Sequence, residues 1–167
     1  PHFGADGGEH GTEWGTLLHV LLEAVMRRPD ADAEKLAYTV LSDLELDTSL
    51  LQDAIETVKS VLESPILQRA GAASQRLAEV PFEMWHEPAA LETGLPTLVR
   101  GVIDLAFLES TGWVIVDYKT DTVAPKAVPQ LVEHYRDQVR LYRKAWQSIT
   151  GETVKEAGLY FTRVDEY

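Results

Sequence analysis

The chain has 167 residues, of which 45% are hydrophobic and 25% charged, the size and balance of one globular domain with a sizeable core. The absence of cysteine excludes disulfides, thiolate zinc sites, iron–sulfur ligation and cysteine nucleophiles. A formal net charge of −12 argues against a free-standing nucleic-acid binder, because such proteins use lysine and arginine to displace counterions from phosphates.

The first part of the chain has the apolar spacing of helices. Hydrophobic residues recurring at three and four positions predict a first helix over residues 12–28. Further helices are expected over 33–46 and over 48–63, the last with Thr48 as its N-cap. A short segment, 66–74, follows without an assigned element. The acidic outer faces of these helices are interpreted as solvated scaffold.

The middle of the chain changes to a period of two, which is typical of strands. Apolar residues alternate around Val80, and Pro81 within this run indicates an edge strand. After turn residues at 92–96, the runs LVRGVIDLAFLES and WVIVDYKTD predict an antiparallel hairpin that turns at Thr111 and Gly112.

The last part of the chain combines a long helix with a final strand. The helix is expected over about 129–150, with Gly151 ending it, and VKEAGLYFTRV has the composition of a strand. Helices first, then a small sheet with an embedded helix, predict an α/β or mixed α+β fold. We expect a flexible lead-in over 1–11 and one domain over 12–167, with a helical part at 12–64 and a sheet core at 75–167.

Two carboxylates end neighbouring strands of the expected hairpin. Asp104 and Asp117 each follow an apolar run, and two carboxylates held side by side repel unless a positive charge joins them. A divalent ion that prefers oxygen ligands, magnesium or manganese, is the obvious candidate. Lys119 shares a face with Asp117 and could stabilise charge that builds on a phosphate. The alternative for an isolated DxK motif, and the commoner outcome, is an exposed ion pair.

Two further polar residues stand out from their surroundings. His19 lies on an otherwise apolar helix, next to the small residues Gly15 and Thr16, which let another element approach closely. A histidine among leucines is more often a satisfied core residue, so this favours a site only weakly. Glu79 opens the predicted edge strand and by itself is an ordinary surface glutamate.

The long helix carries two polar stripes. Tyr135, Gln138 and Tyr142 recur at spacings of three and four, which places them on one face. A cationic stripe is expected beside it, formed by Arg136, Arg140 and Arg143. Together the stripes suit a nucleic-acid backbone. The alternative puts the tyrosines at the core boundary and leaves Gln138 exposed.

Five short motifs occur in an order that resembles a known family. They are GxxxH at 15–19, ExPF at 79–82, GxID at 101–104, DYKT at 117–120 and QxxxY at 138–142. From about Gly11 onward the chain resembles the C-terminal nuclease domain of the AddA and RecB helicase–nucleases, in the PD-(D/E)XK superfamily. The resemblance implies a restriction-endonuclease-like core with a small mixed sheet flanked by helices.

The resemblance also implies roles for individual residues. His19, Asp104 and Asp117 would bind a metal together with the backbone carbonyl of Tyr118. Lys119 would be the catalytic lysine, and Glu79 matches the acidic residue that precedes the metal-binding pair. The residues expected to contact DNA are Gln138, Tyr142, Tyr135, Arg136, Arg140 and Arg143.

The family's activity is metal-dependent cleavage of DNA. The resemblance implies Mg²⁺ as the metal, with Mn²⁺ able to substitute. The implied reaction is attack of an activated water on a backbone phosphate of DNA. A helicase would feed single strands to the site during double-strand-break processing for recombination. ATP would bind only at a helicase region outside this chain. A partner resembling AddB or RecC is implied. AddB holds an iron–sulfur cluster with four cysteines, so a chain without cysteine resembles the AddA or RecB side.

Two alternatives remain beside this interpretation. One is a nuclease-fold module that has lost catalysis and only binds DNA or a partner, and the other is a stand-alone repair or restriction nuclease. No apolar run of about 18 residues and no charged-then-apolar leader is present, which favours a cytoplasmic location. The family resemblance implies that the source is bacterial. The abrupt ends indicate a fragment of a longer protein.

Overall fold

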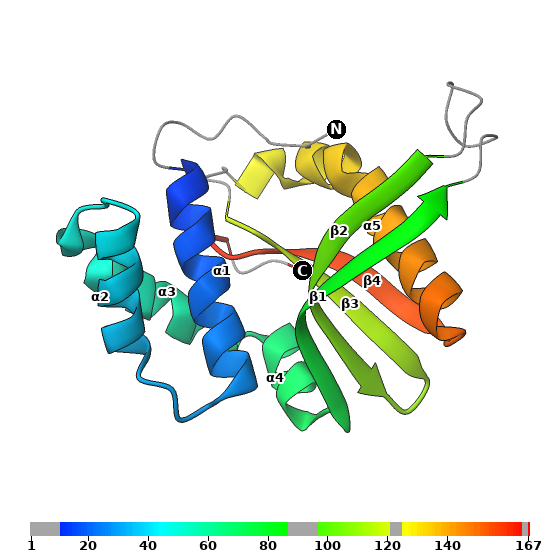
Figure 1. Cartoon of the computed structure of the whole chain (residues 1–167), viewed down its shortest axis with the longest axis horizontal. Coiled ribbons are helices and arrows are strands. Elements are labelled where there is room, and N and C mark those ends of the chain that lie inside the picture. The colour runs from blue at the N-terminus through cyan, green and yellow to red at the C-terminus, as the bar shows by residue number, and fades with distance from the viewer. Residues whose placement is uncertain (1–10, 87–96, 121–124, 165–166) are drawn as a thin grey trace.

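The centre of the molecule is a four-stranded mixed sheet (Figure 1). The computed structural model describes residues 11–86, 97–120, 125–164 and 167. The sheet order is β1-β2-β3-β4, with antiparallel pairing of β1 with β2 and of β2 with β3, and parallel pairing of β3 with β4. The strands are β1 Gln75–His86, β2 Thr97–Glu109, β3 Gly112–Lys119 and β4 Val154–Phe161. The predicted mixed α/β fold, hairpin and edge strand are confirmed.

Helices lie on both sides of this sheet (Figure 1). They are α1 Gly11–Arg27, α2 Ala33–Asp43, η1 Thr48–Leu50, α3 Leu51–Glu63, α4 Pro65–Ala72, η3 Pro125–Ala127 and α5 Val128–Thr150. The first four α-helices pack on one face of the sheet and α5 on the other. None of the helices in the described ranges has the length and apolar character that a membrane crossing requires.

Alternate residues of β3 belong to two different cores, and this alternation positions the site. Val114, Val116 and Tyr118 pack with α1 to α4, whereas Trp113 and Ile115 pack with Tyr142, Ala145 and Trp146 of α5. Because successive strand residues point to opposite faces, Asp117 and Lys119 face α5. The polar end of β3 is therefore directed at the helix that carries the QxxxY motif.

The helical part differs from the sequence-based prediction at three places. The second helix ends at Asp43, because Glu45 has a φ of 55° and Leu46 N–H donates to the Leu41 carbonyl, a C-terminal cap built without glycine. The third helical stretch is capped by Asp47 rather than Thr48. The segment left unassigned contains α4, whose N-terminus is capped by Ser64.

The later elements agree more closely with their predicted bounds. The hairpin turns at Ser110 and Thr111, so that Gly112 is the first residue of β3 rather than part of the turn. The long helix begins one residue before its predicted start and ends at Gly151, which adopts a φ of 73°. The predicted turn at 92–96 lies outside the described residues, as do residues 1–10 of the predicted lead-in.

Candidate metal and catalytic centre

Strand register brings three carboxylates to the middle of the sheet. The pair Leu105 and Val116 is the last registered pair of β2 with β3, so Asp104 and Asp117 occupy the next positions along the two strands. On the other side of β2, Ala78 and Val80 pair with residues 105 and 103, which places Glu79 opposite Asp104. The expectation that the two hairpin strands bring Asp104 and Asp117 together is therefore met by the register.

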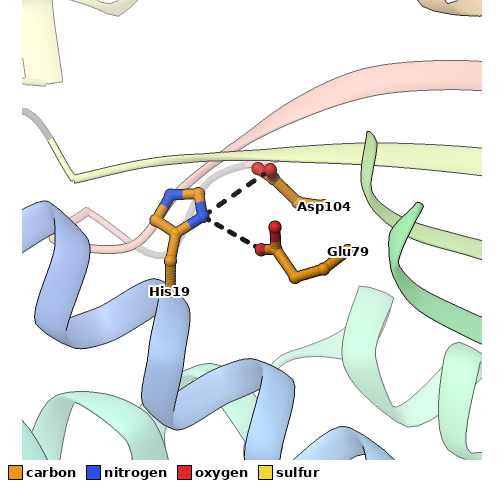
Figure 2. A group of neighbouring side chains, drawn as sticks. All are labelled: His19, Glu79 and Asp104. Carbon is orange, nitrogen blue, oxygen red and sulfur yellow. Dashed lines mark hydrogen bonds and ion pairs between the residues drawn. The ribbon is translucent and has the colours of Figure 1, made fainter. Parts of the chain in front are cut away.

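His19 of α1 lies over two of these carboxylates (Figure 2). Its Nδ1 atom is 3.4 Å from Glu79 Oε1 and 3.6 Å from Asp104 Oδ1. Ligand atoms of the three side chains all lie within 4.8 Å of one another, an imidazole and two carboxylates that suit a divalent ion. The second Asp104 oxygen accepts a 2.6 Å hydrogen bond from the Tyr118 amide, which fixes the orientation of the carboxylate. We name this trio the metal group.

Small residues let α1 reach the sheet at this point. A Cβ atom on Gly15 would come within 2.9 Å of the Thr120 hydroxyl oxygen, so a larger residue would require the Thr120 side chain to shift. Gly15 lies one helical turn before His19, so this close contact lies next to the histidine of the metal group. The predicted role of this glycine as a place of close contact is supported by the geometry.

Glu79 has a backbone conformation that a glutamate seldom adopts. Its φ is 50°, in the left-handed region, and the residues on either side of it pack on opposite faces of the sheet. Ala78 contacts the helical core of α1 to α4, whereas Val80 contacts the core beneath α5. The local turn of the chain interrupts the pairing of β1 with β2 and aims the carboxylate at His19. No sequence signal indicated this, because glutamate is not a residue favoured at positive φ.

Burial gives the carboxylates unusual proton affinities. Asp104 and Asp117 are 7% and 3% exposed. Burial, together with the nearby Asp117 charge, raises the pKa of Asp104 to about 7. Burial also raises the pKa of Asp117, although Lys119 opposes the shift. The site concentrates negative charge that a cation would stabilise.

The pKa of His19 follows from competing effects. Burial lowers it, but the hydrogen bond to Glu79 and the charge of Asp104 outweigh burial, and the net shift is upward. The imidazole is thus held close to acidic partners that favour its protonated form when no metal is bound. A metal ion would compete with that proton for Nδ1.

Lys119 connects Asp117 to α5. Its Nζ lies 2.8 Å from Asp117 Oδ2 and donates a 3.0 Å hydrogen bond to Gln138 Oε1. The ammonium also lies over the Tyr135 ring, 4.0 Å from its centre. The side chains of the DYKT and QxxxY motifs therefore form one network, whereas the sequence predicts catalysis for the first motif and DNA contact for the second. Asp104 and Asp117, the two carboxylates predicted to lie side by side, have different partners. Asp104 belongs to the metal group, and Asp117 forms an ion pair with Lys119.

The arginine stripe lies along α5 where this helix borders β4. Arg136, Arg140 and Arg143 line a hollow of about 460 Å³ between α5 and β4, whose walls include Val132, Val139 and Leu159. Each arginine also has a nearer partner: Arg136 pairs with Glu133, Arg140 with Asp137, and Arg143 donates to the Val154 carbonyl. Their predicted contact with DNA is not tested by this arrangement.

The strained Glu79 backbone allows the roles of its charge and its conformation to be separated. We expect Glu79→Gly to lower the thermal stability of the metal-free chain less than Glu83→Gly does, because glycine relieves a left-handed conformation at residue 79 that costs about 1 kcal/mol. Glu79→Gln should bring no such relief, since the strain remains. Both Glu79 variants should bind Mn²⁺ at least about tenfold more weakly, as loss of a ligand implies.

Calorimetry of Mn²⁺ binding and thermal melts would measure these effects. Glu83→Gly is the matched control, because Glu83 is exposed on the same strand at ordinary φ, and this variant should lower stability without changing metal affinity. Unchanged Mn²⁺ affinity in both Glu79 variants would remove Glu79 from the metal group.

Comparison with known proteins gives a family and a set of relatives. Residues 5–166 match the family model described as the PD-(D/E)XK nuclease superfamily. An ATP-dependent helicase/nuclease subunit of Carboxydothermus hydrogenoformans is 36% identical over 168 residues, and its namesake in Bacillus cereus strain ATCC 10987 is 33% identical over 178 residues. These matches cover 95% and 96% of this chain, but the chain spans only 14% of each relative. A solved structure of protein VC1899 from Vibrio cholerae aligns over 93% of the chain and 43% of that protein, with 13% identity and a TM-score of 0.35.

Proposed function

Because the chain belongs to the PD-(D/E)XK nuclease superfamily, we propose that it is a metal-dependent deoxyribonuclease domain that hydrolyses backbone phosphodiesters of DNA. One observation supports this above all. A candidate metal group, His19, Glu79 and Asp104, lies next to a buried Asp117–Lys119 pair. Carboxylates, imidazole and an ammonium group at one point are the groups that phosphodiester hydrolysis uses.

The residues of the metal group fit a hard divalent ion, Mg²⁺ or Mn²⁺. The donor set is one nitrogen and two carboxylates, and burial together with the Asp117 charge raises the pKa of Asp104, so a bound cation would favour its ionised form. We propose His19, Asp104 and Glu79 as ligands, with Asp117 and the Tyr118 carbonyl completing the protein's share. The ion would supply a charge that polarises a water molecule and a phosphate oxygen.

Lys119 is proposed to act at the phosphate. Its ammonium has three N–H donors, of which one is directed to Asp117 and one to Gln138. The remaining donor can reach a phosphate oxygen on which negative charge increases during the reaction. Because this donor is already fixed in place, it does not have to reorganise when the transition state forms. Asp117 holds the ammonium in place through a short ion pair in a water-poor environment.

The wider context of the reaction follows from the relatives. Proteins named as ATP-dependent helicase/nuclease subunits carry a region like this chain, so we propose that a helicase in the intact protein feeds DNA strands to the site during double-strand-break processing for recombination. A partner like AddB or RecC and a location in the bacterial cytoplasm are part of this proposal. Tethering to a helicase would compensate for weak DNA binding by a chain of net charge −12.

A metal-binding measurement tests the proposal at its base. We expect Mn²⁺ to bind the 167-residue chain and to support nicking of DNA, and His19→Ala to weaken Mn²⁺ binding at least about tenfold. His134→Ala serves as the matched control, because His134 is exposed on α5 outside the metal group. A manganese soak should place an anomalous peak between His19 and Asp104. A folded chain that neither binds Mn²⁺ nor nicks DNA would contradict the proposal and favour a module that only binds.

A further inference from the structure

The environment of Lys119 is built largely by one face of α5. Tyr135 lies beneath the ammonium, with its ring centre 4.0 Å from Nζ, and Gln138 Oε1 accepts a hydrogen bond from it. Tyr135 is 6% exposed, so the ring is part of the core rather than a surface side chain. A cation placed over an aromatic face in a water-poor site is attracted to the ring electrons. The contact therefore restricts where the flexible lysine side chain can place its charge.

The hydrogen bonds on this face have only one consistent direction. Lysine can only donate, so the atom of Gln138 that faces it must be the carbonyl oxygen. The amide nitrogen then donates to the Tyr142 hydroxyl at 2.8 Å. The chain of donors runs from Lys119 through Gln138 to Tyr142, and the Lys119 ammonium also forms an ion pair with Asp117.

We propose that Tyr135 is a positioning residue for Lys119, and that the α5 face formed by Tyr135, Gln138 and Tyr142 holds the catalytic lysine rather than the DNA strand. The inference rests on the proposed nuclease function. Both ends of the Gln138 amide are engaged within the protein, and Tyr142 is 7% exposed, so contact of this amide with a strand would break its hydrogen bonds to Lys119 and Tyr142. We assign the positioning effect to the aromatic ring, because the ammonium lies 4.0 Å from the ring centre.

A magnetic resonance experiment tests this contact without any reaction. Protons held over an aromatic face resonate upfield, so the ε-methylene signal of Lys119 should be shifted upfield in the metal-free, DNA-free chain labelled with ¹³C-lysine. The chain has six lysines, and Lys119→Met identifies the signal by removing it. We expect the shift to persist in Tyr135→Phe and to be lost in Tyr135→Leu. A Lys119 signal at the position of the exposed lysines in the unaltered chain would overturn the proposal, even if Tyr135→Leu fails to fold.

Steady-state cleavage of a short single strand with Mg²⁺ separates positioning from strand binding. Tyr135→Leu should lower kcat about 10- to 100-fold, the cost of a misplaced catalytic group, while KM stays within about threefold. Tyr135→Phe should restore kcat to within about threefold of the unaltered chain. Tyr38→Leu is the matched control, because Tyr38 is 55% exposed on α2.

The outcomes of the two measurements are distinct. A raised KM with unchanged kcat in Tyr135→Leu would assign Tyr135 to strand binding and overturn the proposal. Absence of cleavage by the unaltered chain would contradict the proposed function, whereas the ring-shifted Lys119 signal would still decide whether α5 positions the lysine.

Discussion

Replacing Lys119 by methionine is expected to lower the rate of DNA cleavage by about 10²- to 10³-fold. This is the usual effect of removing one fixed hydrogen-bond donor that stabilises the charge developing in the transition state. The ammonium is the only cation within 4 Å of Asp117 among the described residues, and it is 14% exposed. Methionine keeps the length of the side chain but leaves no donor for the phosphate. Single-turnover cleavage with saturating Mg²⁺ would measure the chemical step directly.

The fold of this variant must be checked, because Lys119 also compensates a buried charge. Removing one partner of a buried ion pair is commonly destabilising, although Asp117 can take up a proton because its pKa is already raised. A thermal melt should therefore show a folded variant with reduced stability. Lys59→Met is the matched control on the exposed face of α3 and should leave cleavage and stability unchanged. A Lys119 variant that is folded and fully active would exclude the proposed role.

Asp104→Asn is expected to stabilise the metal-free chain at neutral pH while abolishing cleavage. The folded-state pKa of Asp104 is about 7, above the unfolded value of 3.8, so the folded state binds more protons between these pH values. Stability from this group is present below about pH 4 and is lost as the pH rises through 7. The raised pKa of His19 acts in the same direction. Asparagine removes the buried charge yet can still accept the hydrogen bond from the Tyr118 amide.

Thermal melts at several pH values would test this prediction. The metal-free chain should melt at a higher temperature at pH 6 than at pH 8, and this difference should shrink in Asp104→Asn. At pH 8 we expect the free energy of unfolding of Asp104→Asn to exceed that of the unaltered chain by on the order of 2 kcal/mol. Added Mn²⁺ should stabilise the unaltered chain and not the variant. Asp43→Asn, on the exposed end of α2, is the control. A melting temperature lowered by Asp104→Asn at pH 8 would contradict the inferred burial of an uncompensated charge.

The parts of the fold that were predicted correctly have strong local signals. The hairpin follows from two long apolar runs, and the end of α5 follows from Gly151, the residue favoured at a left-handed cap. The end of α2 was missed because Glu45 occupies the corresponding left-handed position, where glycine would have indicated it. Helix α4 was missed although Ser64 and Pro65 form a usual helix start, because its eight residues are too few for a clear period.

The sequence predicts those parts of the site that depend on where strands end and on residue spacing along helices. The expected hairpin placed Asp104 and Asp117 side by side, but spacing did not reveal that Asp117 is buried rather than part of an exposed ion pair. The conformation of Glu79 depends on packing of its neighbours in two separate cores, which no local pattern encodes. Spacing placed the three arginines on one stripe of α5, but it does not reveal that this stripe borders a hollow against β4.

The metal group and the α5 face formed by Tyr135, Gln138 and Tyr142 come from segments far apart in the chain, and this has a consequence for protein synthesis. A ribosome delivers His19 of α1 long before the α5 face, and a domain generally folds as a unit. While α5 is still in the exit tunnel, the ammonium of Lys119 lacks both the Tyr135 ring and the Gln138 acceptor. We expect Lys119 to be held in place only after α5 has left the exit tunnel, because only then are the Tyr135 ring and the Gln138 acceptor both present.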